Sequence, residues 1–148
     1  MPEGLSKVSV SDVRTAVPTT PGVEAGMVTL REDEAPHRLV PIVIGQPEAR
    51  AIQSAWTGAA QRRPSTWDLF VSAVSILDGR LDRAVITAVE DGRHFYANIE
   101  IERDGERRVL AARPSDAIAL ALRAYSADIF VADQVFKDLG LGEAPLDN

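Results

Sequence analysis

The chain has 148 residues and contains no cysteine. A protein without thiols has no disulfide, no thiolate nucleophile, no cysteine-ligated zinc and no iron–sulfur cluster. Histidine is scarce as well, because His37 and His94 are the only two, and they do not form the closely spaced pairs of zinc hydrolases. These absences leave carboxylates and arginines as the main candidates for chemistry.

Motifs of several common enzyme classes are also missing. The chain has no Gly-x-x-x-x-Gly-Lys-Ser/Thr loop, no Gly-x-Gly-x-x-Gly after a strand and no Gly-x-Ser-x-Gly. Their absence argues against nucleoside-triphosphate-binding, dinucleotide-binding and α/β-hydrolase folds.

Long apolar runs are missing too. The run Leu39–Ile44 is far shorter than the roughly 20 residues that cross a bilayer. The N-terminal Met-Pro-Glu-Gly has neither the basic nor the apolar stretch of a secretory signal. We therefore expect a cytoplasmic protein that does not contact a membrane.

The charge balance is acidic. Sixteen Lys and Arg residues face 22 Asp and Glu residues, for a net charge of −6 and an isoelectric point of about 4.9. Such a chain lacks the broad positive field of proteins that bind nucleic acid by charge alone, so any phosphate binding must be local. The length and the absence of repeats predict one domain over residues 1–141 and a frayed tail over residues 142–148.

Apolar residues alternate with polar residues in several runs that read as strands. The predicted strands are residues 5–14, 27–31, 38–44, 84–89, 95–101, 107–112 and 129–131. We expect residues 18–22 to form a loop and a hairpin to join the second and third strands. Because the strands come in runs, the pattern predicts an α+β fold with a mainly antiparallel or mixed sheet of about six or seven strands.

Three main helices and a short C-terminal helix are predicted between these strands. The first runs from Gln46 to Gly58, the second from Ser65 to Gly79, the third from residue 113 to about Tyr125, and the last covers residues 133–139. The second helix opens with a Ser-x-x-Asp capping box. Its apolar face is marked by Leu69, Phe70, Ala73, Val74 and Leu77.

The sequence Arg-Pro-Ser stands directly before two of these helices, at residues 63–65 and 113–115, with Asp68 and Asp116 in the respective first turns. Proline, serine and aspartate all favour a helix start, but the arginine has no capping role. A guanidinium beside a helix N-terminus is a good local site for a phosphate or carboxylate. If the two helix starts lie close together, Arg63 and Arg113 would frame a small cationic pocket.

Other roles for the same residues stay open. Each arginine could pair with an aspartate and only lock the fold. Asp68, Asp116 and Glu48 are suited to a divalent cation in phosphodiester cleavage, although carboxylates in a first turn often serve only the helix dipole.

The polar side of one predicted strand gives a weaker signal. His94, Tyr96, Asn98 and Glu100 alternate there and could face a ligand groove or simply a solvated sheet face.

Four segments in this order resemble the bifunctional nuclease domain family, formerly a domain of unknown function. They are residues 41–49 (PIVIGQPEA), 63–69 (RPSTWDL), 95–97 (FYA) and 112–123 (ARPSDAIALALR), and the resemblance extends over residues 6–141. It implies a bacterial cytoplasmic α+β domain that self-associates and whose plant relatives cleave RNA and DNA. The family usually has histidine at the position of Trp67, which offers neither a lone pair nor titration near neutral pH.

The sequence thus predicts a nuclease that hydrolyses phosphodiester bonds of RNA or DNA, with the enzymatic activity in question because of Trp67. Asp68, Asp116 and Glu48 are the predicted catalytic residues, and Asp68 and Asp116 would also hold Mg²⁺ or Mn²⁺; no organic cofactor is expected. Arg63, Arg113 and Ser115 are the predicted substrate-binding residues. The alternative is a non-catalytic binding or scaffold module that takes a small anion or a partner's carboxylate. A homo-oligomer is expected in either case.

Overall fold

The computed structural model describes residues 4–59, 61–125 and 127–141, so the predicted C-terminal tail lies outside the described residues. In chain order the elements are β1 (Leu5–Thr20), β2 (Val23–Glu32), β3 (Leu39–Ile44), α1 (Gln46–Thr57), α2 (Thr66–Ile76), β4 (Arg80–Glu90), β5 (His94–Arg103), β6 (Glu106–Ala112), α3 (Pro114–Arg123), β7 (Asp128–Ala132) and α4 (Asp133–Asp138).

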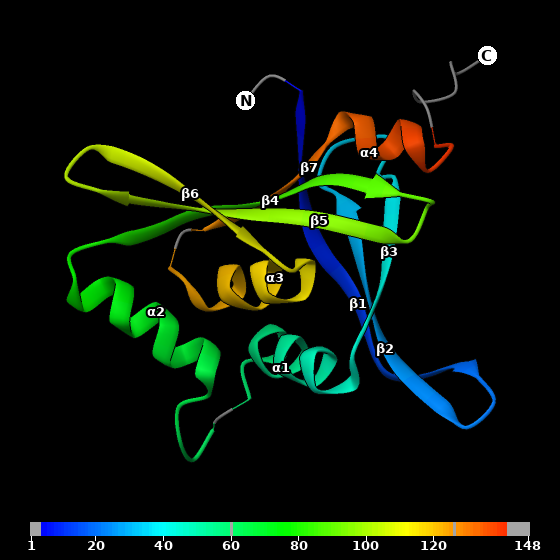
Figure 1. The fold of residues 1–148 in the computed structure, drawn as a ribbon, viewed down its shortest axis with the longest axis horizontal. Helices are drawn as coiled ribbons and strands as arrows, with labels where there is room; N and C mark the ends of the chain where they lie inside the picture. Colours follow the sequence, from blue (N-terminus) through cyan, green and yellow to red (C-terminus); the bar gives the residue numbers. More distant parts are fainter. Residues whose placement is uncertain (1–3, 60, 126, 142–148) are drawn as a thin grey trace.

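The strands form one seven-stranded sheet in the order β3-β2-β1-β7-β4-β5-β6 (Figure 1). Neighbouring strands run antiparallel except β4 and β7, which run parallel because α3 crosses over between the β4–β6 meander and β7. The predicted α+β class, the mixed sheet and the set of three main helices with a short fourth are confirmed.

The loop predicted at residues 18–22 is wrong in extent. β1 continues to Thr20, and β2 begins at Val23, so the turn between them is only two residues long. Pro18 is tolerated in a strand because β7 pairs with β1 only as far as Val8, which leaves one side of β1 without a partner that needs its N–H. The resulting hairpin extends away from the rest of the domain (Figure 1).

The start of β4 was also predicted too late. β4 begins at Arg80 instead of residue 84, because Arg80 and Leu81 pair with Glu102 and Ile101 of β5. A bulge follows Leu81 and interrupts the alternation of apolar and polar residues by which a strand is recognised in a sequence.

The helices α1, α2 and α3 gather on one side of β4, β5 and β6, and α4 lies above β4 (Figure 1). α3 is the most deeply packed, with Ala117 to Ala121 buried without a break. α1 approaches β2 closely, because a Cβ at Gly26 would lie 2.3 Å from the Cβ of Ala49. Within the described part of the chain, none of the helices combines the length and the apolar character that a membrane span needs.

α2 forms where it was predicted, yet it contributes no buried residue to the core. Of the residues predicted to mark its apolar face, Phe70 packs partly against the core, whereas Leu69 and Leu77 are each 64% exposed. The predicted apolar face is therefore split between the protein interior and the surface.

Candidate functional site

An open hollow of about 450 Å³ lies beside the N-terminus of α3, where the β3–α1 junction meets the start of β5. Its polar lining consists of Glu48, Arg93, His94, Tyr96, Arg113 and Ser115. We call it the Arg113 hollow. Three of the predicted site residues, Glu48, Arg113 and Ser115, therefore share one cavity.

Arg113 is the N-cap residue of α3 and lies between two carboxylates. Its Nε donates to Asp116 Oδ2 at 2.8 Å, its Nη2 donates to Asp116 Oδ1 at 3.2 Å, and its Nη1 lies 3.6 Å from Glu48 Oε1. The hydrogen bonds and charge of Asp116, with the charge of Glu48, raise the pKa of Arg113. The ion pair that was held open as an alternative is thus present, although the Arg113 side chain is still 64% exposed.

Glu48 reaches Arg113 from the first turn of α1, and the backbone at Gly45 makes room for it. A Cβ at Gly45 would lie 2.1 Å from Glu48 Oε2, so a larger residue would displace the carboxylate. Gly45 is thus a part of the site that supplies space rather than a functional group.

Trp67 joins the start of α2 to the start of α3. Its Nε1 donates to Asp116 Oδ1 at 3.1 Å, so both oxygens of Asp116 accept hydrogen bonds. A second hollow of about 460 Å³, lined in part by Trp67, Phe70 and Leu110, borders the same carboxylate. The two helix starts do lie close together, as the sequence analysis considered, but they are joined by an indole and a carboxylate.

Asp68 points to a different partner. It accepts hydrogen bonds from the Ser65 N–H and hydroxyl, both at 2.7 Å, which completes the predicted capping box. These bonds, together with the Arg123 guanidinium 3.0 Å away, lower the pKa of Asp68. Asp68 fixes the start of α2 and is not among the residues that line the Arg113 hollow.

Arg123, to which the sequence analysis gave no role, binds all three packed helices. Its side chain is 9% exposed, and besides Asp68 it donates to the backbone oxygens of Ala119 and Ala51, each at 2.9 Å. Its guanidinium also lies over the Trp67 ring. Its position in the last turn of α3, two turns from Asp116, is the only signal that the sequence offered for this role.

Arg63 is not brought to the hollow. Its side chain is exposed, and among the described residues it makes no hydrogen bond or ion pair. Arg63 therefore lines neither of the two hollows described above, and it does not frame either of them together with Arg113.

Carboxylates do not gather into a metal-ligand cluster in the described ranges. No group of three His, Asp or Glu side chains among residues 4–59, 61–125 and 127–141 is arranged to hold a metal ion. Asp68 and Asp116 are instead held separately, by Arg123 and Arg113.

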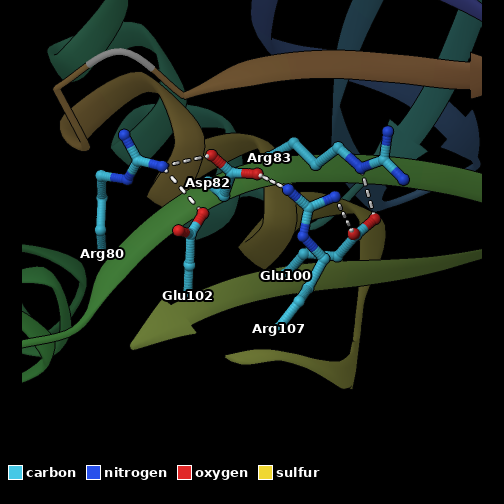
Figure 2. A network of polar contacts seen from close by, with 6 residues as sticks. All are labelled: Arg80, Asp82, Arg83, Glu100, Glu102 and Arg107. Carbon is cyan, nitrogen blue, oxygen red and sulfur yellow. Dashed lines mark hydrogen bonds and ion pairs between the residues drawn. The ribbon is translucent and has the colours of Figure 1, made fainter. Parts of the chain in front are cut away.

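The polar stripe of β5 divides into two parts. Glu100 is buried and paired with Arg83 and Arg107, in a network that also contains Arg80, Asp82 and Glu102 (Figure 2). This network ties β4, β5 and β6 together and contributes no open site. His94, at the start of β5, faces the Arg113 hollow instead.

Arg93 and His94 are the residues that sequence reasoning missed or left open at this site. Arg93 is the last residue of the turn between β4 and β5, His94 is the first residue of β5, and both are exposed at the hollow. An arginine followed by a histidine, directly after Asp91-Gly92, was the available signal. Arg93 makes no ion pair among the described residues, so its charge is free to meet an anion.

An α+β domain in which arginines, a histidine and a helix N-terminus line one open hollow has the residue types of an anion-binding or hydrolytic site. The chain belongs to the bifunctional nuclease domain family, whose model matches residues 28–143. Two uncharacterised proteins of Mycobacterium tuberculosis, from strains CDC 1551 and H37Rv, are each 34% identical to it over 137 residues, which is 93% of this chain and 77% of each relative.

Proposed function

We propose that the protein binds and hydrolyses a phosphodiester of RNA or DNA in the Arg113 hollow. The observation that carries this proposal is the presence of Arg93, His94 and Arg113 around one open cavity at the N-terminus of α3. Outward backbone amides of a helix start add to the positive potential that a phosphate group needs. The family to which the chain belongs supports a phosphodiester as the anion.

Each group has a distinct role in this proposal. Arg93 and Arg113 bind the non-bridging phosphate oxygens and stabilise the charge that develops on them. His94 removes a proton from the attacking water, a new P–O bond forms, and the bond to the leaving oxygen breaks as that oxygen takes a proton from solvent. Glu48 and Asp116, two of the three carboxylates predicted to be catalytic, orient Arg113 and do not contact the phosphate, which they would repel.

The binding of a divalent cation by Asp68 and Asp116 stays a prediction. Asp68 and Asp116 are each engaged by an arginine, so the described carboxylates do not fit a shared metal site, and the proposed steps include no metal ion. Cleavage assays with Mg²⁺, Mn²⁺ or a chelator test this directly. An activity that disappears with the chelator would restore the predicted metal role of these carboxylates.

Activity variants test the proposed roles. We expect the wild-type chain to cleave short fluorescent RNA or DNA, and His94→Gln to lower the rate by about a hundredfold, the lower end of the range for a lost general base. Arg113→Lys should also lower the rate, because the single ammonium group of lysine cannot replace a planar guanidinium that binds two partners at once. Arg108→Ala is the matched control, since Arg108 is exposed on β6 and outside the hollow. Equal rates in all four proteins would refute the proposal.

A non-catalytic anion-binding module is the second candidate. The observation in its favour is that Glu48 and Asp116 already pair with Arg113, which suits a bracing role. In that case Arg113→Ala would lower the melting temperature by about 2–4 °C, since exposed ion pairs contribute at most about 1 kcal/mol, and no cleavage would be found. A phosphate-binding Arg113 would lose activity with the melting temperature almost unchanged.

We further propose that the protein acts in the cytoplasm and as a homo-oligomer. The absence of cysteine is consistent with a reducing compartment. The exposed apolar side chains of α2 support self-association.

A further inference from the structure

The second hollow, of about 460 Å³, has a lining that the binding of a phosphate does not explain. We call it the Trp67 hollow. Its walls come from α2 and α3 and from the strands β5 and β6, and Figure 1 shows both helices on one side of these strands. Most of its surface is apolar and is provided by Trp67, Phe70, Ile99, Leu110 and Leu120. An aromatic and aliphatic lining of this kind suits a flat, uncharged group.

The two hollows meet at Arg113. This side chain lines both of them, whereas Asp116 lines the Trp67 hollow and not the Arg113 hollow. The negative charge of Asp116 repels a second phosphate, so the Trp67 hollow favours the uncharged part of a ligand whose phosphate lies on the other side of Arg113. A nucleotide has this composition, because its phosphate is joined through a sugar to a flat base.

Polar groups of the Trp67 hollow match the edge of a base. Asp116 accepts one hydrogen bond from Trp67 and two from Arg113. A carboxylate can accept about four, so one position is open to an N–H of a base. The Thr66 hydroxyl also lines the hollow, forms no hydrogen bond within the described ranges, and can both donate and accept. The hollow therefore offers a stacking surface together with partners for the edge of a base.

The phosphate of such a nucleotide has an anchor at the start of α3. Ser115 lines the Arg113 hollow and is only 6% exposed, and its hydroxyl has no hydrogen-bond partner among the residues that the structure describes. The backbone N–H groups of Ser115 and Asp116 lie in the first turn of α3 and have no acceptor within the helix. A buried hydroxyl and two amides are donors that phosphate oxygens can satisfy. They hold the phosphate beside Arg113, where the two hollows meet.

We infer that the Trp67 hollow binds the base next to the phosphodiester, so that the substrate is single-stranded RNA or DNA. This inference rests on the proposed binding of a phosphodiester in the Arg113 hollow. A base of a single strand can turn into the hollow, whereas a base of a duplex is stacked and paired and enters only if it is flipped out. Stacking on aromatic side chains accepts every base, so the hollow selects single strands without selecting a sequence.

Fluorescence anisotropy tests the inference with three labelled ligands that carry uncleavable phosphorothioate linkages. They are a short single strand of DNA, the same strand built from abasic sugar–phosphate units, and a hairpin duplex of the same sequence. We expect the strand with bases to bind about tenfold more tightly than the abasic strand or the duplex, because stacking of one base on aromatic side chains contributes at least this factor. Arg113→Ala should weaken the binding of both single strands.

Two neighbouring residues of β6 provide a matched pair of variants. Leu110 is 49% exposed and lines the Trp67 hollow, whereas Val109 is 61% exposed and points to the opposite face of the strand. Leu110→Ala should lower the ratio of the two single-strand affinities, with bases over abasic, by about threefold or more, because it removes part of the apolar wall. Val109→Ala should leave this ratio unchanged. Circular dichroism of both variants verifies that the chain is folded.

The fluorescence of Trp67 reports where the base binds. The chain has one other tryptophan, Trp56, which is 43% exposed on α1 and lines neither hollow. In Trp56→Phe, Trp67 is the only indole, and we expect the strand with bases to quench its emission and the abasic strand to leave it almost unchanged.

The outcomes separate this inference from the proposed function. Equal affinities for the strand with bases and the abasic strand, both lost in Arg113→Ala, would overturn the base site and leave the phosphate site intact. Equal affinities for single strand and duplex would overturn the preference for single strands. Equal effects of Leu110→Ala and Val109→Ala, or emission of Trp67 that bases do not quench, would place the base outside the hollow. Failure of all three ligands to bind would overturn the inference together with the proposed function.

Discussion

At the scale of single residues, Trp67 shows how one substitution can keep a structural contact and lose a chemical group. The indole Nε1 donates to Asp116, as an imidazole N–H could from the same position. An imidazole has a second nitrogen that can accept a proton or bind a metal ion, and an indole does not. The residue that departs from the family pattern therefore still connects α2 to α3.

We predict that Trp67→His raises the cleavage rate, because histidine can retain the hydrogen bond to Asp116 and adds a titratable nitrogen next to the site. Trp67→Phe is the control, since it keeps an aromatic ring without the N–H and should lower the free energy of unfolding by about 1 kcal/mol. Initial rates on the same oligonucleotides check this prediction. A Trp67→His variant no faster than the wild type would show that the position serves packing alone.

Arg123 is a second residue whose effect extends beyond its neighbours. We predict that Arg123→Ala lowers the free energy of unfolding by about 3 kcal/mol, because it leaves Asp68 without its ion pair and two backbone oxygens without their donor. Urea denaturation measures this loss. Arg80→Ala is the control, because its ion pairs are more exposed and should contribute less than about 1 kcal/mol. Equal losses in the two variants would contradict the bridging role of Arg123.

At the scale of elements, the sequence pattern predicted every helix and strand of the described residues, but it misplaced three boundaries by four residues or more: the end of β1 and the starts of β2 and β4. The periodicity of α1 and α3 and the capping box of α2 are local signals, and they were sufficient for these helices. The extension of β1 through Pro18 and the early start of β4 depend on which strand lies alongside, and no local pattern records that information. The outward orientation of α2 likewise depends on tertiary packing.

The packing of α1 on β2 gives a prediction at this scale. Gly26→Ala should lower the free energy of unfolding by about 1–3 kcal/mol, because its Cβ would collide with the buried Ala49. Ala49→Gly removes the other methyl group, at a cost of about 1 kcal/mol in the helix. The double variant should be more stable than the sum of the two single losses predicts, and chemical denaturation of all three measures the coupling. Strict additivity would contradict the contact.

At the scale of the whole molecule, stability should depend on carboxylates that are paired in the native state. Burial alone would raise the pKa of Glu32, but the hydrogen bonds and charge of Arg38 lower it overall, as Ser65 and Arg123 do for Asp68. The native state therefore binds fewer protons than the unfolded chain as the medium becomes acidic. The free energy of unfolding should be constant near neutral pH and fall below about pH 4.

Urea unfolding between about pH 7 and about pH 3 measures this dependence. Asp68→Asn should be less stable than the wild type at neutral pH, and the difference should shrink in acid, where the wild-type carboxylate is protonated. A difference that stays constant with pH would contradict the lowered pKa.

The candidate site was only partly predictable from the sequence. Glu48, Arg113 and Ser115 were found because they stand at helix starts, which local motifs reveal. Arg63 and Asp68 share the same motif but lie elsewhere, because the motif specifies a helix start and not the direction in which a side chain points. Arg93 and His94 enter the hollow from the junction of the β4–β5 turn with β5, and only the sheet brings that junction to α3.

The central claim is that a phosphodiester binds in the Arg113 hollow, and nuclear magnetic resonance can test it without requiring turnover. A phosphorothioate-linked dinucleotide is titrated into the ¹⁵N-labelled chain, and the amide shifts are followed. We predict that the shifts concentrate at Gly45, Arg93, His94 and Ser115, and that Arg113→Ala abolishes them. Shifts confined to the exposed segment around Arg63, or no shifts at all, would contradict the account.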